Sequence, residues 1–161
     1  MTSEPFNYLV LAYYNYTRID DAGTFAPLHL AYCKNLKLRG RIYVAQEGIN
    51  GTISGTKEAC EQYMRDLVAD PRFATTEFKI DEVAEHAFQR MHCRYKTEIV
   101  YSGLRDPNVI DPTKETGKHL KGEEFLALKD QDDVVILDVR SNYETRLGKF
   151  KNAITLDMEN F

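Results

Sequence analysis

The sequence predicts an α+β fold, in which a β-α-β-β-α-β sandwich is followed by the first elements of a second, α/β unit. Three observations lead to this prediction. Residues 1–102 hold short runs of β-branched and aromatic residues, with two segments of helical apolar spacing between them. Residues 103–122 contain two prolines and three glycines, and another apolar run follows at 134–139. The order of the first six elements is that of a ferredoxin-like split βαβ sandwich.

The first strand and the first helix are predicted from residues 8–36. Tyr8–Tyr14 is a continuous β-favouring run, typical of a central strand. Residues 25–36 form a helix, with Thr24 as the expected N-cap and Gly40 placed to end it. The apolar stripe of this helix consists of Phe25, Leu28, Tyr32 and Leu36.

A hairpin follows the first helix. Arg41–Ala45 and Thr52–Ser54 are its two strands. Glu47–Gly51 is predicted to form the turn, because Asn-Gly readily supplies the positive φ angles of a tight hairpin.

The remaining elements follow in order. A second amphipathic helix begins near Thr56 and ends before Pro71, and Glu77–Asp81 alternates as a fourth strand. Residues 90–101 are predicted to form an additional strand. The chain therefore divides into a ferredoxin-like domain at 1–102, a linker at 103–122 and a second unit at 123–161. In this last unit a short helix at 123–129 precedes a buried strand at 134–139.

Composition limits the class of protein. Hydrophobic residues make up 43% of the 161 residues, enough for a core, and no apolar run approaches the roughly 20 residues of a membrane span. The first residues lack the features of a signal peptide, and the three isolated cysteines suit reduced thiols in the cytoplasm. Net charge is −4, but residues 1–102 carry 12 Lys and Arg against 13 Asp and Glu, so any basic face must be local.

The most unusual local pattern is the run RMHCRYK at 90–96. In a strand its side chains alternate between two faces. Met91, Cys93 and Tyr95 then share one face, and Arg90, His92, Arg94 and Lys96 share the other. These four basic groups would extend over about 20 Å, which suits several phosphates of one nucleic-acid backbone. The alternative is a solvated face whose charges pair with nearby acids such as Glu98.

A second basic group precedes this run and consists of Lys34, Lys37, Arg39 and Arg41. Lys34 and Lys37 are expected in the last turn of the first helix, where cations interact favourably with the helix dipole. We expect this second group to contact RNA only as an extension of the row at 90–96.

Other chemistries find little support. The glycines of residues 40–55 fit neither a Walker motif nor a dinucleotide-binding fingerprint. The four histidines lack the spacing of metal ligands, so no metal is predicted, and none of the three cysteines adjoins an evident base. Acylphosphatases share the split βαβ order and need a glycine- and arginine-bearing loop after the first strand. Here that loop carries Asp20 and Asp21, which argues against acylphosphatase activity.

Three blocks resemble one bacterial family. They are GRIYVAQEGINGTISG at 40–55, FQRMHCRYKTEIV at 88–100 and VILDVRSNYE at 135–144. The family is that of the rhodanese-related, oxygen-dependent tRNA uridine hydroxylases. The first two blocks are specific to it, whereas the Asp-x-Arg of the third resembles the opening of any rhodanese domain.

The resemblance implies an enzyme that forms 5-hydroxyuridine at the wobble position of tRNA, with molecular oxygen as co-substrate and no other cofactor. It implies a catalytic Cys in a rhodanese loop beyond Phe161, so that residues 123–161 are an incomplete rhodanese domain and the chain alone is inactive. Asp138, Arg140 and Glu144 would support that loop. The anticodon arm of tRNA would be held by Arg41, Arg90, His92, Arg94 and Lys96.

Two alternatives remain open from the sequence. A rhodanese-type sulfurtransferase would carry sulfur as a persulfide on the same cysteine. A non-catalytic ferredoxin-like binding module would have a rhodanese loop with no cysteine.

Overall fold

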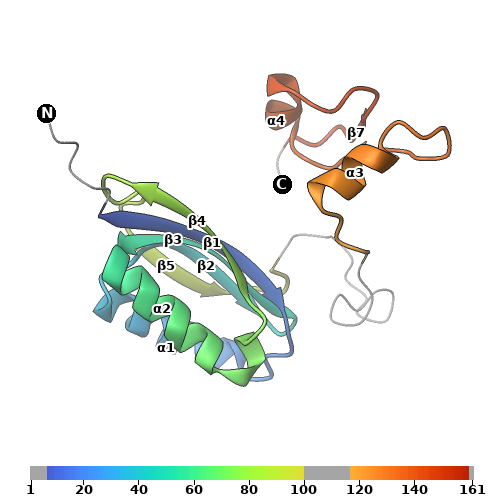
Figure 1. Ribbon diagram of the computed structural model, residues 1–161. Helices are drawn as coiled ribbons and strands as arrows, with labels where there is room; N and C mark the ends of the chain where they lie inside the picture. Colours follow the sequence, from blue (N-terminus) through green and yellow to red (C-terminus); the bar gives the residue numbers. More distant parts are fainter. Residues whose placement is uncertain (1–6, 100–116, 160–161) are drawn as a thin grey trace, which may run out of the picture. The chain divides into compact units, whose positions relative to one another are not determined.

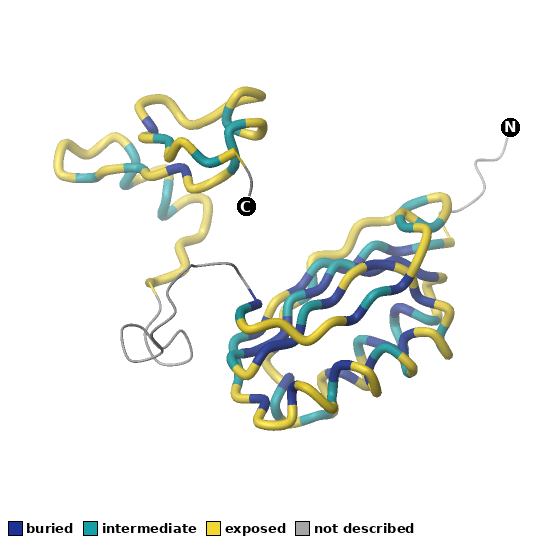
Figure 2. The backbone as a smooth tube through the Cα atoms, turned by 180° about the vertical axis from the view of Figure 1, so that it is seen from behind, coloured by how far each residue is buried: buried dark blue, intermediate teal, exposed yellow. Residues whose placement is uncertain are grey.

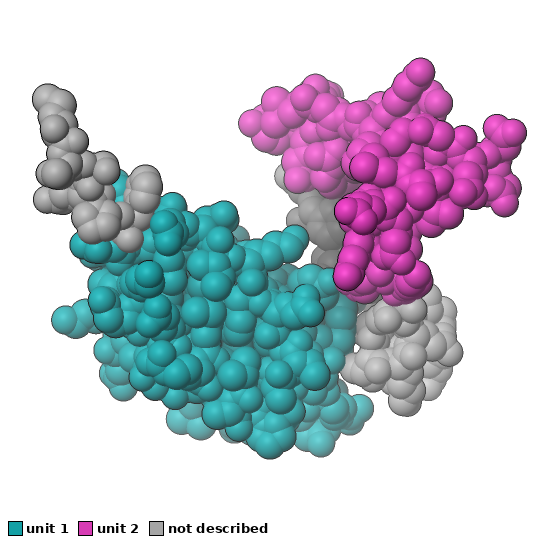
Figure 3. Space-filling model, in the orientation of Figure 1, with its two compact units in different colours: residues 1–115 teal, residues 116–161 magenta. Residues whose placement is uncertain are grey.

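The computed structural model describes residues 7–99 and 117–159 (Figure 1). The chain forms two compact units, residues 1–115 and 116–161, which are coloured separately in Figure 3. No helix in the described ranges is long and apolar enough to cross a membrane. The elements of the first unit are β1 (Tyr8–Tyr16), α1 (Ala22–Asn35), β2 (Arg39–Ala45), β3 (Gly48–Thr56), α2 (Lys57–Ala69), η1 (Pro71–Phe73), β4 (Glu77–Val83) and β5 (Met91–Tyr95).

The first unit is a five-stranded sheet of order β4-β1-β3-β2-β5 with α1 and α2 on one face (Figure 1). The strands pair antiparallel, except that β5 joins β2 in parallel. The predicted order of six elements is therefore present, and β5 is the predicted additional strand. The buried residues belong to the sheet and to the two helices that cover it (Figure 2), and they form one hydrophobic core. The largest fully buried ones include Leu11, Ile42, Ile53, Tyr63 and Phe73.

The hairpin turn is not where the sequence predicted it. Ala45 pairs with Gly48, so Gln46 and Glu47 form the turn, and Asn50 and Gly51 lie inside β3. The glycines serve close packing instead. A Cβ at Gly48, whose φ is 152°, would lie 2.1 Å from the Asn15 carbonyl oxygen.

α1 begins and ends earlier than predicted. Asp21 occupies the N-cap position, and Thr24, the predicted cap, lies in the first turn, where its hydroxyl donates to the Asp21 carbonyl (2.9 Å). The helix ends at Asn35, and Lys37, with φ of 56°, reverses the chain, so that Gly40 lies within β2. The buried stripe is Ala22, Ala26, His29 and Cys33, whereas the predicted Leu28 is 71% exposed.

The second unit contains two short helices and two short strands: α3 (Gly122–Leu128), β6 (Leu137–Asp138), α4 (Asn142–Leu147) and β7 (Ile154–Thr155). The predicted helix at 123–129 is present as α3. The predicted buried strand is wrong in length and burial, since only two residues pair and Val135, Leu137 and Val139 are exposed. In the described residues β6 has only β7 beside it, and a two-stranded sheet covers little apolar surface.

Candidate nucleic-acid interface

The predicted basic row follows β5, which forms one edge of the sheet. The parallel register places Arg41 of β2 beside His92, and Tyr43 beside Arg94. Both arginines are exposed, whereas Tyr43 and His92 are half-buried. The register therefore brings Arg41, which the sequence placed in the second basic group, beside the row through pairing between residues about 50 positions apart.

The inward face of β5 is only partly as predicted. Met91 and Cys93 are 8% and 7% exposed and pack in the core, but Tyr95 is 50% exposed. Tyr95 is the last residue of β5, which lies at the edge of the sheet. The strand is also shorter than predicted, although the Lys96 amide still donates to the Val44 carbonyl (2.8 Å). Residues 100 and 101 of the predicted strand lie outside the described residues.

The cations of this row have no acidic partner among the described residues. Arg41, Arg90, Arg94 and Lys96 take part in none of the ion pairs there, so pairing with acids such as Glu98 does not account for them. The Lys96 ammonium instead lies 5.4 Å from the centroid of the Tyr43 ring. Cations without an acidic partner along one edge of the sheet are what contact with a phosphate backbone requires.

The segment after β5 is fastened to the β2–β3 hairpin. The Glu47 carboxylate accepts a hydrogen bond from the Ile99 amide (2.7 Å), and the Asn50 amide donates to the Ile99 carbonyl (3.2 Å). Ile99 is 3% exposed. Glu47 therefore holds the segment after β5 against the hairpin.

The second basic group meets the first one in space. Lys34 lies in the last turn of α1, where the helix dipole accounts for it, but Lys37 lies beyond the helix and Arg39 begins β2. All three line a hollow that Arg90 and His92 also line. The sequence did not single out His86, which lines the same hollow, because only the fold brings residue 86 beside Tyr8 of β1 and Ser54 of β3.

A sequence model of the family described as the UPF0176 acylphosphatase-like domain matches residues 8–99. The chain belongs to this family. Among curated relatives, proteins named tRNA uridine(34) hydroxylase from Cytophaga hutchinsonii and Bacillus mycoides are 56% and 50% identical to it. The matches cover 96% and 99% of this chain and 49% of each relative, so the chain spans about half the length of these relatives. These names confirm the resemblance recognised in the three sequence blocks.

Solved structures add a distant likeness. The BLUF proteins described as BlrP1 BLUF and BlrB are 20% and 16% identical to the chain, with TM-scores of 0.48 and 0.43. The matches cover 57% and 55% of this chain and 66% and 75% of those chains. A likeness of this size carries no argument about function.

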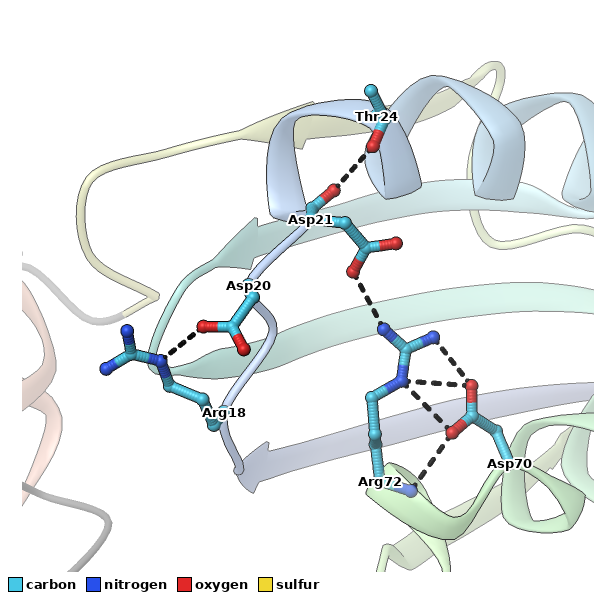
Figure 4. A network of polar contacts seen from close by, with 6 residues as sticks. All are labelled: Arg18, Asp20, Asp21, Thr24, Asp70 and Arg72. Atoms are coloured by element: carbon cyan, nitrogen blue, oxygen red, sulfur yellow. Dashed lines mark hydrogen bonds and ion pairs between the residues drawn. The ribbon is translucent and has the colours of Figure 1, made fainter.

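In this member of the UPF0176 family, the loop between β1 and α1 is held together by ion pairs (Figure 4). Arg18 contacts Asp20 (2.7 Å), and Arg72 reaches Asp21 (2.9 Å) while also pairing with Asp70 (2.7 Å). Arg72 presents no unpaired positive charge to the loop, because its guanidinium pairs with two carboxylates. The same pairing lowers the pKa of Asp70. The loop is therefore an acidic, internally paired connection, unlike the anion-binding loop of acylphosphatases.

The three cysteines are buried in the core as free thiols. Burial raises the pKa of Cys60 to about 11 and that of Cys93 to about 12, and it raises the pKa of Cys33 as well. None of them has the exposed, electropositive surroundings of a nucleophile. Among residues 7–99 and 117–159, no group of three or more His, Cys, Asp or Glu is placed to hold a metal ion.

The three polar residues of the rhodanese-like block have local partners. Asp138 accepts hydrogen bonds from the Arg140 guanidinium at 2.9 and 2.7 Å, and this pairing lowers the pKa of Asp138. Arg140 also donates to the Gly148 carbonyl (2.8 Å). Glu144 accepts from the backbone and hydroxyl of Ser141 at the start of α4. The structure thus brings Asp138 and Arg140 together, while Glu144 caps a helix.

Proposed function

We propose that this chain is the N-terminal part of a cytoplasmic tRNA-modifying enzyme that hydroxylates the wobble uridine at C5 with molecular oxygen. Residues 8–99 hold the anticodon arm of the tRNA. The relatives named tRNA uridine(34) hydroxylase support the reaction, since they are 50–56% identical to this chain. The row of unpaired cations along β5 supports the role of this domain.

The row is the observation that carries the proposal. Arg41 and Arg94 project from neighbouring parallel strands, and Lys96 extends the line above Tyr43. Cations at this spacing bind successive phosphates without reading bases, which suits an enzyme that must grip the arm and leave the wobble base to another part of the protein. Tyr43 adds an aromatic ring in the same line, and bases stack on such rings.

In this proposal the second unit is the start of a rhodanese domain, with a domain boundary within 103–122. The Asp138–Arg140 pair and the Glu144 cap fix the chain after β6. Rigid support of this kind would hold a neighbouring loop that carries the catalytic Cys implied by the resemblance. We expect the present chain to bind tRNA without hydroxylating it.

Binding across a salt series tests the proposal. A labelled anticodon stem-loop RNA with uridine at the wobble position is titrated with the 161-residue chain and with Arg94→Ala/Lys96→Ala. We expect the double variant to bind more weakly and to reduce the slope of log K against log salt by about 2, roughly one per lost phosphate contact. Arg65→Ala/Lys79→Ala is the matched control, because it removes two exposed charges from α2 and β4.

Wild-type binding that is absent, or that is insensitive to salt, would contradict the proposed role of residues 8–99. The reaction itself is tested in the full-length protein. Oxygen-dependent formation of 5-hydroxyuridine should disappear when the rhodanese cysteine is replaced. Sulfur transfer to cyanide without any effect on tRNA would favour the sulfurtransferase instead.

A further inference from the structure

A hollow of about 1040 Å³ opens where β2 and β5 begin. Its walls come from three separate parts of the chain: the end of α1 with the connection to β2, the segment before β5, and the ends of β1 and β3. Six basic or titratable nitrogen-bearing side chains line it: Lys34, Lys37, Arg39, His86, Arg90 and His92.

No acidic residue is among the lining residues. Lys34, Lys37, Arg39 and Arg90 also take part in no ion pair with any described residue. Arg72 of the same unit, by contrast, pairs with two carboxylates. A concave surface lined by charges of one sign focuses the electrostatic field and attracts counter-ions. The hollow is therefore suited to binding an anion.

Backbone contacts fix the positions of the segments that carry these cations. The Gly40 amide donates to the Arg90 carbonyl (2.9 Å), which ties the start of β2 to the start of β5. A Cβ at Gly40 would lie 2.2 Å from the Thr52 carbonyl oxygen, so this close approach requires glycine. Leu38, at 2% exposure, anchors the connection between Lys37 and Arg39 in the core.

His86 reports on the field inside the hollow. Its Nδ1 lies 3.3 Å from the Ser54 hydroxyl, and its ring contacts the Tyr8 ring at 4.9 Å between centroids. Partial burial lowers its pKa, and the nearby positive charge of Arg39 lowers it further. Arg39 therefore lies close enough to His86 to influence its protonation.

We propose that this hollow binds a backbone phosphate of the RNA that lies along β5. The inference rests on the proposed function and extends it, because Arg90 and His92 belong both to the row and to the hollow. A strand of RNA that follows Lys96, Arg94 and His92 reaches the hollow at Arg90, after about 20 Å at roughly 3.3 Å per residue. The hollow would then fix where the RNA path ends, because a concave site holds one phosphate in place whereas an open row of cations lets the backbone slide.

Three variants that each remove two charges test the proposal in the 161-residue chain. Lys34→Ala/Lys37→Asn empties the hollow of two cations and leaves the row intact. Asn is chosen at 37 because the residue there has φ of 56°, which Asn tolerates. Arg94→Ala/Lys96→Ala alters the row only, and Arg65→Ala/Lys79→Ala alters neither. Far-ultraviolet circular dichroism and urea unfolding check that each variant is folded.

We expect the hollow variant to reduce the slope of log K against log salt for the anticodon stem-loop RNA by about 1, because one phosphate contact is lost. The ratio of wild-type to variant affinity should then fall about 4-fold between 50 and 200 mM salt. The contact is located with a set of RNAs, each of which carries a neutral methylphosphonate at a different linkage. At one position this change should weaken binding to the wild type and leave binding to the hollow variant unchanged.

The outcomes separate the two proposals. A row variant that weakens binding beside a hollow variant that matches the control would overturn the hollow and leave the proposed function standing. Loss of RNA binding by the wild type itself would overturn the proposed function. Inorganic phosphate that binds to the hollow without displacing RNA would show a site for a small phosphate ester, and it too would overturn the inference.

Discussion

Acidification should destabilise the first unit through one buried side chain, His29. It lies on the buried face of α1 at 8% exposure, and its Nε2 shares a hydrogen bond of 2.9 Å with the Tyr63 hydroxyl. The Tyr63 hydroxyl also bonds to that of Tyr13, and Phe25 stacks on the imidazole at 4.9 Å. Burial among these rings lowers the pKa of His29 from 6.5 to about 4.

The direction of the stability change follows from the linkage between protonation and folding. The folded-state pKa is below the unfolded one, so the unfolded chain takes up the proton first as the pH falls. The full stability is present above about pH 6.5 and is lost progressively towards pH 4. The gap between the two pKa values corresponds to roughly 3 kcal/mol when complete, and about 2 kcal/mol of it is lost by pH 5.

Urea unfolding at several pH values between about 7.5 and 5 measures this loss, with near-ultraviolet circular dichroism of the tyrosines as the signal. His29→Gln is the comparison, because Gln can bond to the Tyr63 hydroxyl and does not titrate. We expect the wild type to lose about 2 kcal/mol more than the variant over this range. The lowered pKa of His86 contributes in the same direction but is present in both proteins. Parallel pH profiles would refute the assignment of this loss to His29.

Two glycine substitutions and one chemical probe test the packing of the core. Gly51→Ala places a Cβ 2.6 Å from the Tyr13 hydroxyl oxygen, so we expect overpacking to lower the free energy of unfolding by about 1–3 kcal/mol. Gly23→Ala in α1 meets nothing within 4 Å and should stabilise by up to about 1 kcal/mol, and equal effects of the two would contradict the packing argument. The three buried thiols, with their raised pKa values, should resist iodoacetamide in the native protein and react fully in urea. Stoichiometric labelling of the native protein at neutral pH would show that the core opens readily.

Elements with a strong local pattern were predictable from the sequence, and the hairpin shows where local pattern fails. Asn50-Gly51 has the composition of a tight turn, yet Ala45 pairs with Gly48 and the turn forms at Gln46 and Glu47. Gly51 lies opposite Tyr13 in the β1–β3 register, and the Tyr13 ring occupies the space that a side chain at 51 would need. A glycine required by packing across the sheet therefore resembled a glycine required by a turn.

The candidate site was predictable to the extent that it follows one strand. Alternation alone placed Arg94 on an outward face of β5, and that face carries the proposed interface. The hollow was not predictable, because Lys37 and Arg90 are more than 50 positions apart in the sequence. They meet only through the parallel pairing of Gly40 with Met91, which no short-range pattern encodes.

The net charge of −4 does not oppose RNA binding, because the charges are separated across the sheet. β4 forms the edge opposite β5 and carries the exposed acids Glu77, Asp81 and Glu82. Four strand spacings of about 4.8 Å separate the two edges by roughly 19 Å, more than twice the Debye length of about 8 Å at physiological salt. The field of these acids is therefore largely screened at β5, where the free cations dominate. The same acids would repel a phosphate backbone that approaches β4, so in the proposed binding mode the charge distribution would orient the RNA before any specific contact forms.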